Sequence, residues 1–332
     1  MAQIKLAING FGRIGRQAFK IAMDNKKVEV VAINDLSETR ILAHLLKYDT
    51  AYSRYNKKVS YDSDHLIVNG KKIKVYAERE PNRLPWKKLG IDAVLECTGA
   101  FTTKEKAGLH LKAGAKKVII SAPAKSEGIQ SIVCGVNDSQ YKGEAIVDTS
   151  SCTTNCAGPV AGVVNKKFGI EKGFLTTIHS YTGDQNLQDG SHKDLRRARA
   201  AAQNMVPTTT GAAIAVTRAI PELVEKFDGL SIRVPTITVS LVDFTFVLKK
   251  PATVEALNNA FKQASKTYLK NILDTTSEPL VSSDFIGNPF SSIVDLSLTK
   301  VIGGNLAKVI AWYDNEWGYS NRLVEVAAKI CK

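Results

Sequence analysis

The fold of this chain is decided near its start, at residues 4–16, which read IKLAINGFGRIGR. The run Ile4–Ile8 is apolar and typical of a buried strand, the next six residues from Gly10 have the spacing GxGxxG, and apolar residues then recur at helical spacing. A second strand-like run, Val28–Ile33, ends at Asn34 and Asp35. These segments predict a βαβ unit whose glycine turn holds a pyrophosphate at the amino end of a helix.

The turn also indicates which cofactor is bound. Gly10, Gly12 and Gly15 permit a tight turn and a close approach of the backbone to a dinucleotide. The motif alone is a weak signal, but a strand precedes it, a helix follows it, and Asp35 lies twenty residues after Gly15. A carboxylate there accepts hydrogen bonds from the adenosine ribose and repels a 2′-phosphate. We therefore expect NAD in preference to NADP, with a merely structural glycine turn as the alternative.

Strand-like runs continue through the first half, with a helical stretch at residues 103–113 between two of them. The runs are 73–76, 93–97, 117–120 and 145–147. This alternation predicts an α/β fold with a Rossmann-type, doubly wound parallel sheet. We place this NAD-binding domain at residues 1–151.

The pattern of residue types changes beyond residue 151, where long β-branched runs surround an amphipathic helical stretch at 254–269. The runs are 174–179, 237–248 and 308–313. They predict an α+β catalytic domain at residues 152–315, built on a largely antiparallel sheet. Residues 181–205 carry no strand pattern and much charge, which predicts a long functional loop.

Composition narrows the class of protein. The chain has 332 residues, of which 44% are hydrophobic, enough for two domains with a large core. We expect no secretory signal and no membrane span, because no run approaches roughly 18 consecutive apolar residues. The five cysteines are odd in number and widely spaced, which disfavours a disulfide framework and favours the cytoplasm.

The net charge of +13 comes largely from Lys-Lys pairs dispersed along the chain. Dispersed pairs are typical of solvated corners, with the attraction of anionic metabolites as the functional alternative. An RNA-binding or scaffolding role lacks both a clustered basic run and an aromatic recognition motif. We therefore expect no membrane partner and no specific nucleic-acid partner.

The candidate nucleophile is Cys152, which lies in the polar segment SSCTTNC at 150–156. We expect it to begin a helix, where the dipole favours the thiolate. A buried structural cysteine is the alternative, and the polar neighbours argue against it. Cys156, one turn further, is expected to be packing, and no metal is expected because a zinc site needs a second ligand pair.

The candidate base is His179. It is the one of five histidines that ends a β-rich run and begins a polar loop, SYTGD. A neighbouring imidazole is the usual means of activating a thiol, so we predict that Cys152 and His179 meet in space. A structural histidine is the alternative.

Two further features suit phosphate. Residues 207–213 read PTTTGAA, typical of a helix start with capping threonines and hence of an anion site. Arg196, Arg197 and Arg233 carry guanidinium groups that pair bidentately with phosphate. For each arginine taken alone, a surface ion pair is the alternative.

Together these residues resemble the phosphorylating glyceraldehyde-3-phosphate dehydrogenase family over nearly the whole chain. The motifs that carry the resemblance are residues 9–16, 150–156, 179–185, 194–200 and 312–320. The cysteine motif and the last segment, WYDNEWGYS, are the most specific of these.

The resemblance implies a mechanism and a set of site residues. Cys152 would attack the aldehyde of glyceraldehyde 3-phosphate, His179 would take the hydroxyl proton as hydride leaves for NAD, and inorganic phosphate would cleave the thioester to 1,3-bisphosphoglycerate. The residues implied for substrate and phosphate are Ser151, Thr153, Thr182, Arg197, Thr210, Gly211 and Arg233. Those implied for NAD are Asn9, Gly10, Gly12, Arg13, Ile14, Gly15, Asp35, Arg79, Ser121 and Asn315. The resemblance also implies a homotetramer and a C-terminal helix, 316–332, that completes the first domain.

Two points stay open. Gly190 and Ser191 stand where NAD-specific members of the family carry a larger apolar residue and proline, so additional acceptance of NADP is an open alternative while Asp35 opposes it. The alternative enzyme is erythrose-4-phosphate dehydrogenase, a relative that releases its acyl group to water. The intact set for a second phosphate favours phosphorolysis.

Overall fold

A computed structural model describes residues 3–331 of the chain. The chain divides into two compact units. The first comprises the residues up to Ile132 together with 140–150 and the residues from Ser320, and the second comprises 133–139 and 151–319. The segment 133–139 thus belongs with the second unit, whereas the sequence placed it in the NAD-binding domain.

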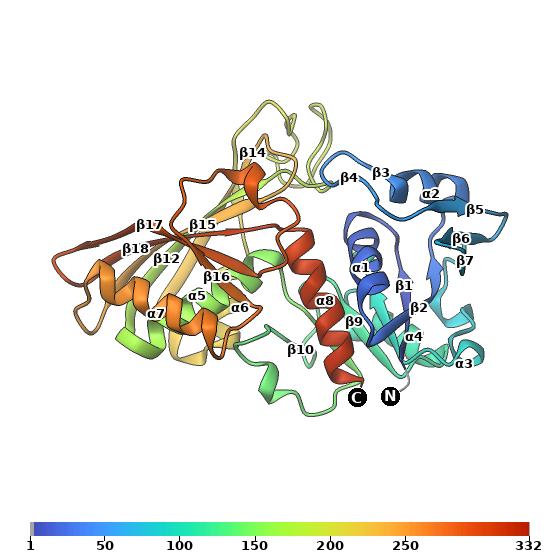
Figure 1. The fold of residues 1–332 in the computed structure, drawn as a ribbon, viewed down its shortest axis with the longest axis horizontal. Coiled ribbons are helices and arrows are strands. Elements are labelled where there is room, and N and C mark those ends of the chain that lie inside the picture. Colours follow the sequence, from blue (N-terminus) through green and yellow to red (C-terminus); the bar gives the residue numbers. More distant parts are fainter. Residues whose placement is uncertain (1–2, 332) are drawn as a thin grey trace. The chain divides into compact units, whose positions relative to one another are not determined.

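The first unit is built on a nine-stranded sheet with the order β10-β11-β9-β8-β1-β2-β7-β6-β5 (Figure 1). Its strands are β1 Ile4–Asn9, β2 Val28–Asn34, β5 Val59–Tyr61, β6 His65–Val68, β7 Lys71–Tyr76, β8 Ala93–Glu96, β9 Lys117–Ile120, β10 Gln130–Ser131 and β11 Ile146–Asp148. β1 pairs in parallel with both β2 and β8, while β6 pairs antiparallel with β5 and β7. The predicted doubly wound parallel sheet is confirmed, and the antiparallel edge extends it.

Helices and a small hairpin complete this unit. The elements are α1 Arg13–Asp24, α2 Thr39–Lys47, β3 Tyr48–Asp49, β4 Ser53–Arg54, the 3-10 helix η1 Pro81–Arg83, α3 Trp86–Leu89 and α4 Lys104–Lys112. α8, Trp317–Ile330, begins in the second unit and ends in the first. The predicted helix at 103–113 is confirmed as α4, whose cap Thr103 accepts a hydrogen bond from the N–H of Lys106.

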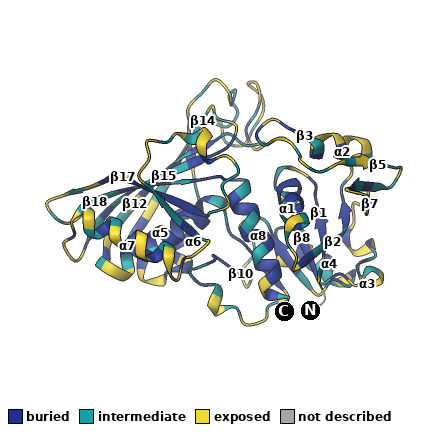
Figure 2. Cartoon of the chain, viewed as in Figure 1, coloured by how far each residue is buried: buried dark blue, intermediate teal, exposed yellow. Residues whose placement is uncertain are grey.

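The central strands of the first sheet are buried on both faces (Figure 2). Leu6 and Ile8 on β1, and Val94 and Leu95 on β8, are completely buried. A parallel sheet covered on both faces needs such continuous apolar runs, which is why they were visible in the sequence. Polar side chains stand at the carboxyl ends of these central strands, Asn9 on β1, Asn34 on β2 and Glu96 on β8.

The second unit is built on a seven-stranded sheet with the order β13-β14-β12-β15-β18-β17-β16. Its strands are β12 Ile170–Ser180, β13 Val206–Thr209, β14 Phe227–Val234, β15 Ser240–Leu248, β16 Leu273–Thr276, β17 Ser292–Ile302 and β18 Leu306–Tyr313. β12 pairs antiparallel with β15 but parallel with β14, and β16 pairs parallel with β17. The sheet is mixed with mostly antiparallel pairs, as predicted.

Three helices lie on one face of this sheet, α5 Cys152–Phe168, α6 Ala212–Ala219 and α7 Val254–Lys266 (Figure 1). The shorter 3-10 helices are η2 Asp138–Gln140, η3 Pro221–Leu223 and η4 Ser282–Phe285. The inward residues of β15, such as Phe244 and Phe246, pack with Val160 of α5 and Phe261 of α7 in one large core. This packing fixes the start of α5 against the strands.

Two sequence expectations need correction in this unit. β15 begins at Ser240, so residues 237–239 of the predicted run lie outside it. β14, β16 and β17 were not predicted, because their polar and exposed residues break the β-branched pattern.

The predicted loop at 181–205 is confirmed as turns and bends without strand. None of the helices in the described part of the chain has the length and apolarity that a bilayer crossing requires.

Candidate active site

The candidate nucleophile stands at the start of a helix, as predicted. Cys152 is the first residue of α5, and Ser151 caps it by accepting the N–H of Thr154 at 3.1 Å. Ser150, just before the cap, has a left-handed φ of 54°, a conformation that a non-glycine residue adopts only at some cost. The backbone therefore turns sharply into the helix and leaves Cys152 at its positive end.

His179 meets the thiol, although its residue number differs by 27. Its Nε2 lies 3.4 Å from Sγ of Cys152. On the other side of the ring, Nδ1 lies 2.7 Å from the carbonyl oxygen of Ser180. The Ser180 carbonyl can only accept a hydrogen bond, whereas Arg233 Nη1, 3.0 Å from the same Nδ1, can only donate. In the tautomer with the proton on Nδ1, both Nδ1 and Arg233 Nη1 donate to the Ser180 carbonyl, and the lone pair of Nε2 faces the sulfur. This is the tautomer that a base toward Cys152 requires.

The charges around the pair follow from burial and from one arginine. Burial raises the pKa of the Cys152 thiol, while the Arg233 guanidinium and hydrogen bonds from Thr153 act in the opposite direction. Burial lowers the pKa of His179 to about 3, and Arg233 adds to this shift. In this structure both groups are therefore neutral at pH 7, with the proton on the sulfur of Cys152.

Arg233 reaches the site through strand register. β12 and β14 are parallel, and His179 and Arg233 are partners across them. Nη1 of Arg233 lies 3.0 Å from Nδ1 of His179 and donates to the carbonyl of Ser180 at 3.2 Å. Its Nε is buried without a hydrogen-bond partner among the described residues.

Asn315 lies in the same unit, close to His179. Its Oδ1 accepts hydrogen bonds from Ser180 Oγ at 2.9 Å and Ser240 Oγ at 3.2 Å. These bonds fix the amide so that its oxygen points into the protein.

Sequence reasoning gave no role to Tyr313. This buried residue ends β18, and its hydroxyl lies 2.8 Å from Thr153 Oγ1 and 2.9 Å from Thr177 Oγ1. Its ring packs edge-on against His179, with centroids 6.0 Å apart. Tyr313 thus ties the start of α5 to β12. The motif WYDNEWGYS drew attention to the segment, but no local pattern reveals this contact.

The loop at 181–205 holds Arg197 in a network of its own. Arg197 pairs with Asp184, and its Nε donates to Thr208 Oγ1 at 3.0 Å. Asp194 lies 3.4 Å from the same nitrogen. Arg197 is therefore bound to carboxylates in this structure. Thr182 lies in the turn after β12, where its carbonyl accepts the N–H of Gln185.

The segment PTTTGAA differs from its expected form. Thr208 and Thr209 lie in strand β13, not at the helix start. Thr210 precedes α6, and its Oγ1 accepts the N–H of Ala212 at 3.2 Å, while Gly211 occupies the cap position. No threonine therefore occupies the cap: Thr210 bonds to the first helical residue from just before it, and Thr208 and Thr209 were misplaced because a short strand and a capping run share the same residue types.

In the first unit, a cavity of about 480 Å³ lies at the carboxyl ends of β1, β2 and β8. Predicted cofactor residues Asn9, Gly10, Gly12, Asp35 and Arg79 line it. Further lining residues are Asn34, Leu36, Glu78, Cys97, Thr98, Ala100 and Phe101. Ligands of open α/β sheets bind at this edge, so the position suits a dinucleotide.

The three glycines of the turn have different reasons to be glycine. Gly10 has φ +89°, and a Cβ there would lie 2.8 Å from the nitrogen of Thr98. A Cβ on Gly15 would lie 2.1 Å from the carbonyl oxygen of Gly10. A Cβ on Gly12 would meet no atom of the described residues within 4 Å. Gly10 and Gly15 are thus required by packing, and Gly12 leaves open space for a ligand.

The other cofactor candidates of the first unit lie at the turn, at the start of α1 or after β9. Asp35 accepts the N–H of Phe11 at 2.8 Å and so also holds the turn in place. Arg13 and Ile14 begin α1, where Arg13 pairs with the buried Asp49 at 2.9 Å. Ser121 follows β9, and its N–H bonds to the carbonyl of Glu96. The ion pair of Arg13 was not predicted.

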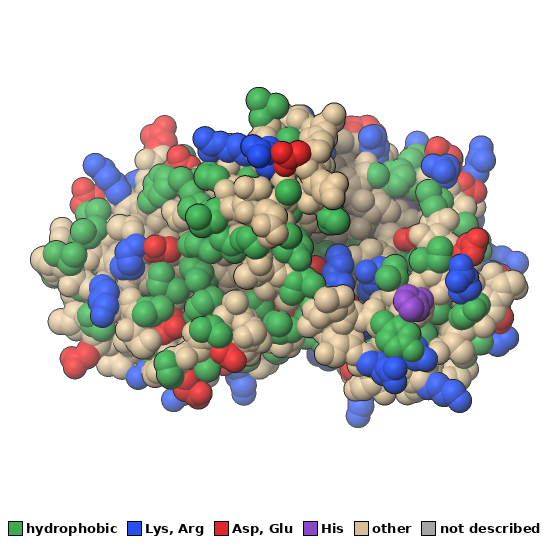
Figure 3. All heavy atoms as spheres, turned by 90° about the horizontal axis from the view of Figure 1, so that it is seen from above, with side chains coloured by type: hydrophobic (Ala, Val, Ile, Leu, Met, Phe, Trp, Pro, Cys, Tyr) green, Lys and Arg blue, Asp and Glu red, His purple; other side chains and the backbone are tan. Residues whose placement is uncertain are grey.

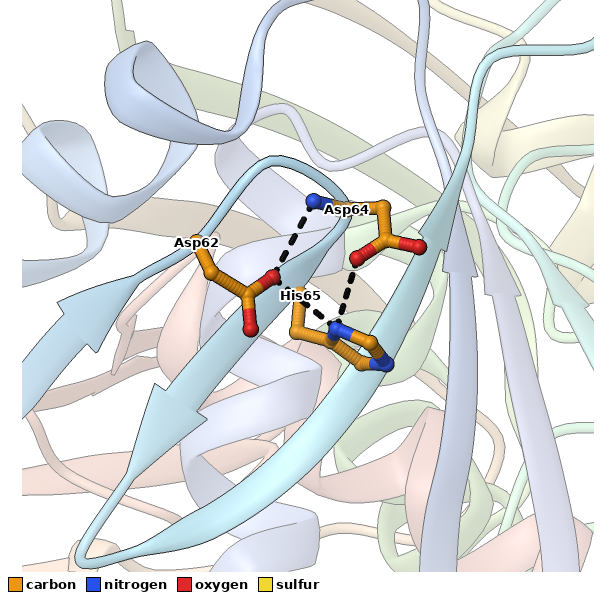
Figure 4. A group of neighbouring side chains, drawn as sticks. All are labelled: Asp62, Asp64 and His65. Carbon is orange, nitrogen blue, oxygen red and sulfur yellow. Dashed lines mark hydrogen bonds and ion pairs between the residues drawn. The ribbon is translucent and has the colours of Figure 1, made fainter.

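One group of metal-ligand type occurs in the described residues, formed by Asp62, Asp64 and His65 (Figure 4). Nδ1 of His65 lies 2.9 Å from Asp62 Oδ1 and 2.8 Å from Asp64 Oδ1. The other oxygens of these carboxylates pair with Lys72 and Lys74. The acidic charge is thus already matched by lysines, and the group is an ion-pair network at the β5–β6 turn.

The fold and site define a dinucleotide-binding protein in which a thiol lies beside an imidazole. Residues 4–104 match the model of the glyceraldehyde 3-phosphate dehydrogenase NAD binding domain, and residues 151–315 match that of the C-terminal domain of the same enzyme. The chain belongs to the glyceraldehyde-3-phosphate dehydrogenase family, as its motifs indicated, and the match to an NAD binding domain confirms the expected cofactor.

Curated relatives extend over almost the whole chain. Glyceraldehyde-3-phosphate dehydrogenase 1 of Bacillus cereus is 55% identical over 98% of this chain and 97% of its own length. Glyceraldehyde-3-phosphate dehydrogenase of Geobacillus stearothermophilus is 53% identical, with 98% of each chain covered. The protein of that name from Zymomonas mobilis is 52% identical over 99% of each chain.

Proposed function

We propose that this protein oxidises D-glyceraldehyde 3-phosphate with NAD and inorganic phosphate to give 1,3-bisphosphoglycerate. The observation that carries the proposal is the 3.4 Å approach of Cys152 Sγ and His179 Nε2 in a chain of this family. The alternative, erythrose-4-phosphate dehydrogenase, uses the same thiol but passes its acyl group to water. All the curated relatives quoted above are named for the first activity.

Each step uses a group described above. His179 accepts the thiol proton, and the Cys152 thiolate adds to the aldehyde carbon. His179 returns this proton to the carbonyl oxygen, which gives the neutral thiohemiacetal and restores the free base. His179 then takes the hydroxyl proton as the carbon is oxidised to a thioester, and NAD supplies the hydride acceptor. Inorganic phosphate attacks the thioester and releases the thiolate. The N–H of Cys152, at the start of α5, is placed to stabilise the oxyanion.

The anionic substrate and phosphate need cationic and hydroxyl partners. We assign Arg233 and Thr182 to the substrate phosphate, which the buried, unpartnered Nε of Arg233 supports. Ser151, Thr153, Thr210 and Gly211 are assigned to the attacking phosphate or neighbouring contacts. Arg197 joins them only if phosphate displaces a carboxylate, because Asp184 and Asp194 hold it in this structure.

The chain's own residues fit a dinucleotide. Gly12 leaves open space at the amino end of α1, and Asp35 lines the same cavity. We assign the adenosine ribose to Asp35, with Asn9, Gly10, Arg13, Ile14, Gly15, Arg79 and Ser121 around it and Asn315 on the carboxamide. Gly190 and Ser191 are exposed and small, which supports some acceptance of NADP.

The decisive experiment follows NADH absorbance with glyceraldehyde 3-phosphate and NAD, with and without inorganic phosphate. Wild type and Cys152→Ser are compared, with Cys156→Ser as the matched control. We expect turnover that requires phosphate and vanishes in Cys152→Ser alone. Turnover on erythrose 4-phosphate that is indifferent to phosphate would favour the alternative enzyme, and absence of turnover in wild type would refute both.

We further propose a homotetramer, supported by the face of the second sheet opposite its helices. Phe174 on β12, Leu230 on β14 and Leu306 on β18 are 45%, 37% and 38% exposed. Figure 3 shows hydrophobic side chains gathered over this unit. A patch of this kind in a water-soluble enzyme usually marks a protein interface. Light scattering should give four subunits for wild type and fewer for Phe174→Asp, with the exposed Val224→Asp as control.

A cytoplasmic location is proposed on the state of the cysteines. All five, at positions 97, 134, 152, 156 and 331, are free in the structure. Free thiols, one of them the proposed nucleophile, need a reducing compartment. On the face drawn in Figure 3, Lys and Arg side chains are scattered without a continuous stripe, which supports the expectation of no specific nucleic-acid partner.

A further inference from the structure

A chain of buried polar side chains runs beneath the cofactor cavity of the first unit. Its members are Trp86 after η1, His110 on α4, Glu96 at the end of β8, Asn9 at the end of β1 and Asn34 at the end of β2. All five are at least 95% buried. Buried polar groups in such number are costly unless each is paired, and here each has a partner of the required kind.

The hydrogen bonds fix the form of His110. Trp86 Nε1 lies 3.0 Å from His110 Nδ1, and an indole N–H can only donate. Nδ1 is therefore an acceptor, and the proton of the neutral ring sits on Nε2. That nitrogen lies 3.0 Å from Glu96 Oε2 and donates to it. The indole thus selects the tautomer that points a donor at the carboxylate.

The carboxylate of Glu96 accepts hydrogen bonds from four donors. Asn9 Nδ2 and His110 Nε2 bond to Oε2, at 2.5 Å and 3.0 Å. The N–H of Thr98 bonds to Oε1 at 2.8 Å, and the hydroxyl of Thr98 bonds to the same oxygen. Four donors and no acceptor face this carboxyl group, which is the environment of an ionised carboxylate. Glu96 therefore holds the start of the segment after β8 in place.

The same chain continues to the other side of the cavity. Asn9 Oδ1 accepts from Asn34 Nδ2 at 2.7 Å, so both amides have one orientation. Asn34 then binds the backbone of Glu78 twice, accepting its N–H and donating to its carbonyl, each at 2.9 Å. Arg79 follows directly in the chain. Bonds from one carboxylate thus reach Asn9, Asn34, Glu78 and Thr98, all of which line the cavity.

We propose that Glu96 and His110 are positioning residues for the dinucleotide: they do not line the cavity but set the segments that do. The inference rests on the proposed placement of NAD in this cavity. Glu96→Gln removes the charge and turns an –NH₂ group toward at least one of the existing hydrogen-bond donors. The ends of β1, β2 and β8 then lose their common anchor, and the residues beside Asp35 and Arg79 shift.

The test compares cofactor affinity with stability. Glu96→Gln and His110→Phe are titrated with NAD and with ADP-ribose, which lacks the nicotinamide, by calorimetry at a temperature where circular dichroism shows them folded. Two controls are Val94→Ala, in the buried middle of β8, and Asp92→Asn, just before the first residue of that strand. Trp86→Phe, which removes the indole donor together with part of the buried ring, serves if a stronger variant fails to fold.

We expect Glu96→Gln and His110→Phe to weaken both ligands by about ten-fold or more, the scale seen when support behind a binding group is lost. KM for NAD should rise while kcat at saturating NAD and KM for glyceraldehyde 3-phosphate stay within about two-fold. Val94→Ala and Asp92→Asn should bind NAD normally, whatever their melting temperatures. Trp86→Phe should act in the same direction as His110→Phe, more weakly.

Asp35→Asn separates this inference from the placement of the cofactor. If Asp35→Asn weakens ADP-ribose but Glu96→Gln and His110→Phe do not, the positioning role is wrong and the cofactor site stands. If neither Asp35→Asn nor the buried variants weaken it, the cofactor site itself is misplaced and the inference is overturned with it. A loss of affinity in Val94→Ala equal to that in Glu96→Gln would show that the network stabilises the fold and does not position the cofactor specifically.

Discussion

The sulfur of Cys152 lies 3.4 Å from Nε2 of His179, and each residue is brought there by the end of a regular element. Cys152 is the first residue of α5, and His179 is the last but one of β12. A helix start and a strand end are rigid supports, so the pair is held in place before substrate binds. The distance suits proton transfer once the substrate draws the groups together.

Removing the imidazole should disable the thiol. In His179→Asn we expect kcat to fall by roughly 10²- to 10⁴-fold, the usual contribution of a positioned base. Alkylation of Cys152 by iodoacetamide at pH 7 should slow as well, because a buried thiol whose pKa is raised no longer has a proton acceptor. Steady-state kinetics and mass spectrometry measure the two effects, with His192→Asn as control. Unchanged alkylation would show that His179 does not activate the sulfur.

The lowered pKa of His179 makes a prediction about acid stability. Its folded value of about 3 lies below the ordinary 6.5, so between these values the unfolded chain binds more protons than the folded one. Folding stability is then lost as pH falls from 6.5 toward 3, by up to about 1.4 kcal/mol per pH unit. His179→Asn lacks this loss and should gain stability relative to wild type as pH falls. Urea denaturation from pH 7 to 4.5 checks this, and parallel curves would contradict it.

The cap of α5 can be separated from its chemistry. Ser151→Ala removes the acceptor for Thr154 N–H and should lower the free energy of unfolding by about 1 kcal/mol. Thr253→Ala removes the equivalent cap of α7, where Oγ1 accepts the N–H of Ala256 at 3.1 Å, and should cost the same. Only Ser151→Ala should lower kcat as well, because it lies beside Cys152. Equal kcat in both variants would limit Ser151 to capping.

Alanine substitutions at two glycines of the same turn should affect different properties, stability at Gly15 and NAD binding at Gly12. Gly15→Ala places a Cβ 2.1 Å from the oxygen of Gly10, so α1 must move and the melting temperature should fall by several degrees. Gly12→Ala meets open space and should leave the melting temperature within about a degree or two. Its methyl group should still weaken NAD binding, since it fills the path of the pyrophosphate. Calorimetry and NAD titration separate the two, and a stable Gly15→Ala would be inconsistent with the packing.

Cofactor preference should depend on Asp35. Its carboxylate opposes a 2′-phosphate and also accepts the N–H of Phe11. Asp35→Gly should therefore raise KM for NAD and shift the ratio of kcat/KM for NADP over NAD by roughly ten-fold or more toward NADP. Asp24→Asn, on the exposed end of α1, is the control. An unchanged ratio would remove Asp35 from cofactor selection.

The sequence by itself determined the elements that carry the site. Each has a local cause within a few residues: the glycine spacing for the turn before α1, the Ser151 cap for the start of α5, and the β-branched run for the strand that ends by His179. Where local types are ambiguous the prediction was wrong, as for Thr208 and Thr209, which form a strand. Capping and steric preferences act over one turn of chain, so the sequence displays them.

The tertiary structure alone decided which of these groups meet. Arg233 stands by His179 because β14 joins β12 in one particular parallel register, and β14 itself was not predicted. Tyr313 reaches Thr153 across 160 residues, and His110 reaches Glu96 through the packing of α4 on the sheet. Such contacts depend on strand order and on burial, which have no signature within a short window. The pKa of about 3 for His179 has the same origin, since it arises mainly from burial.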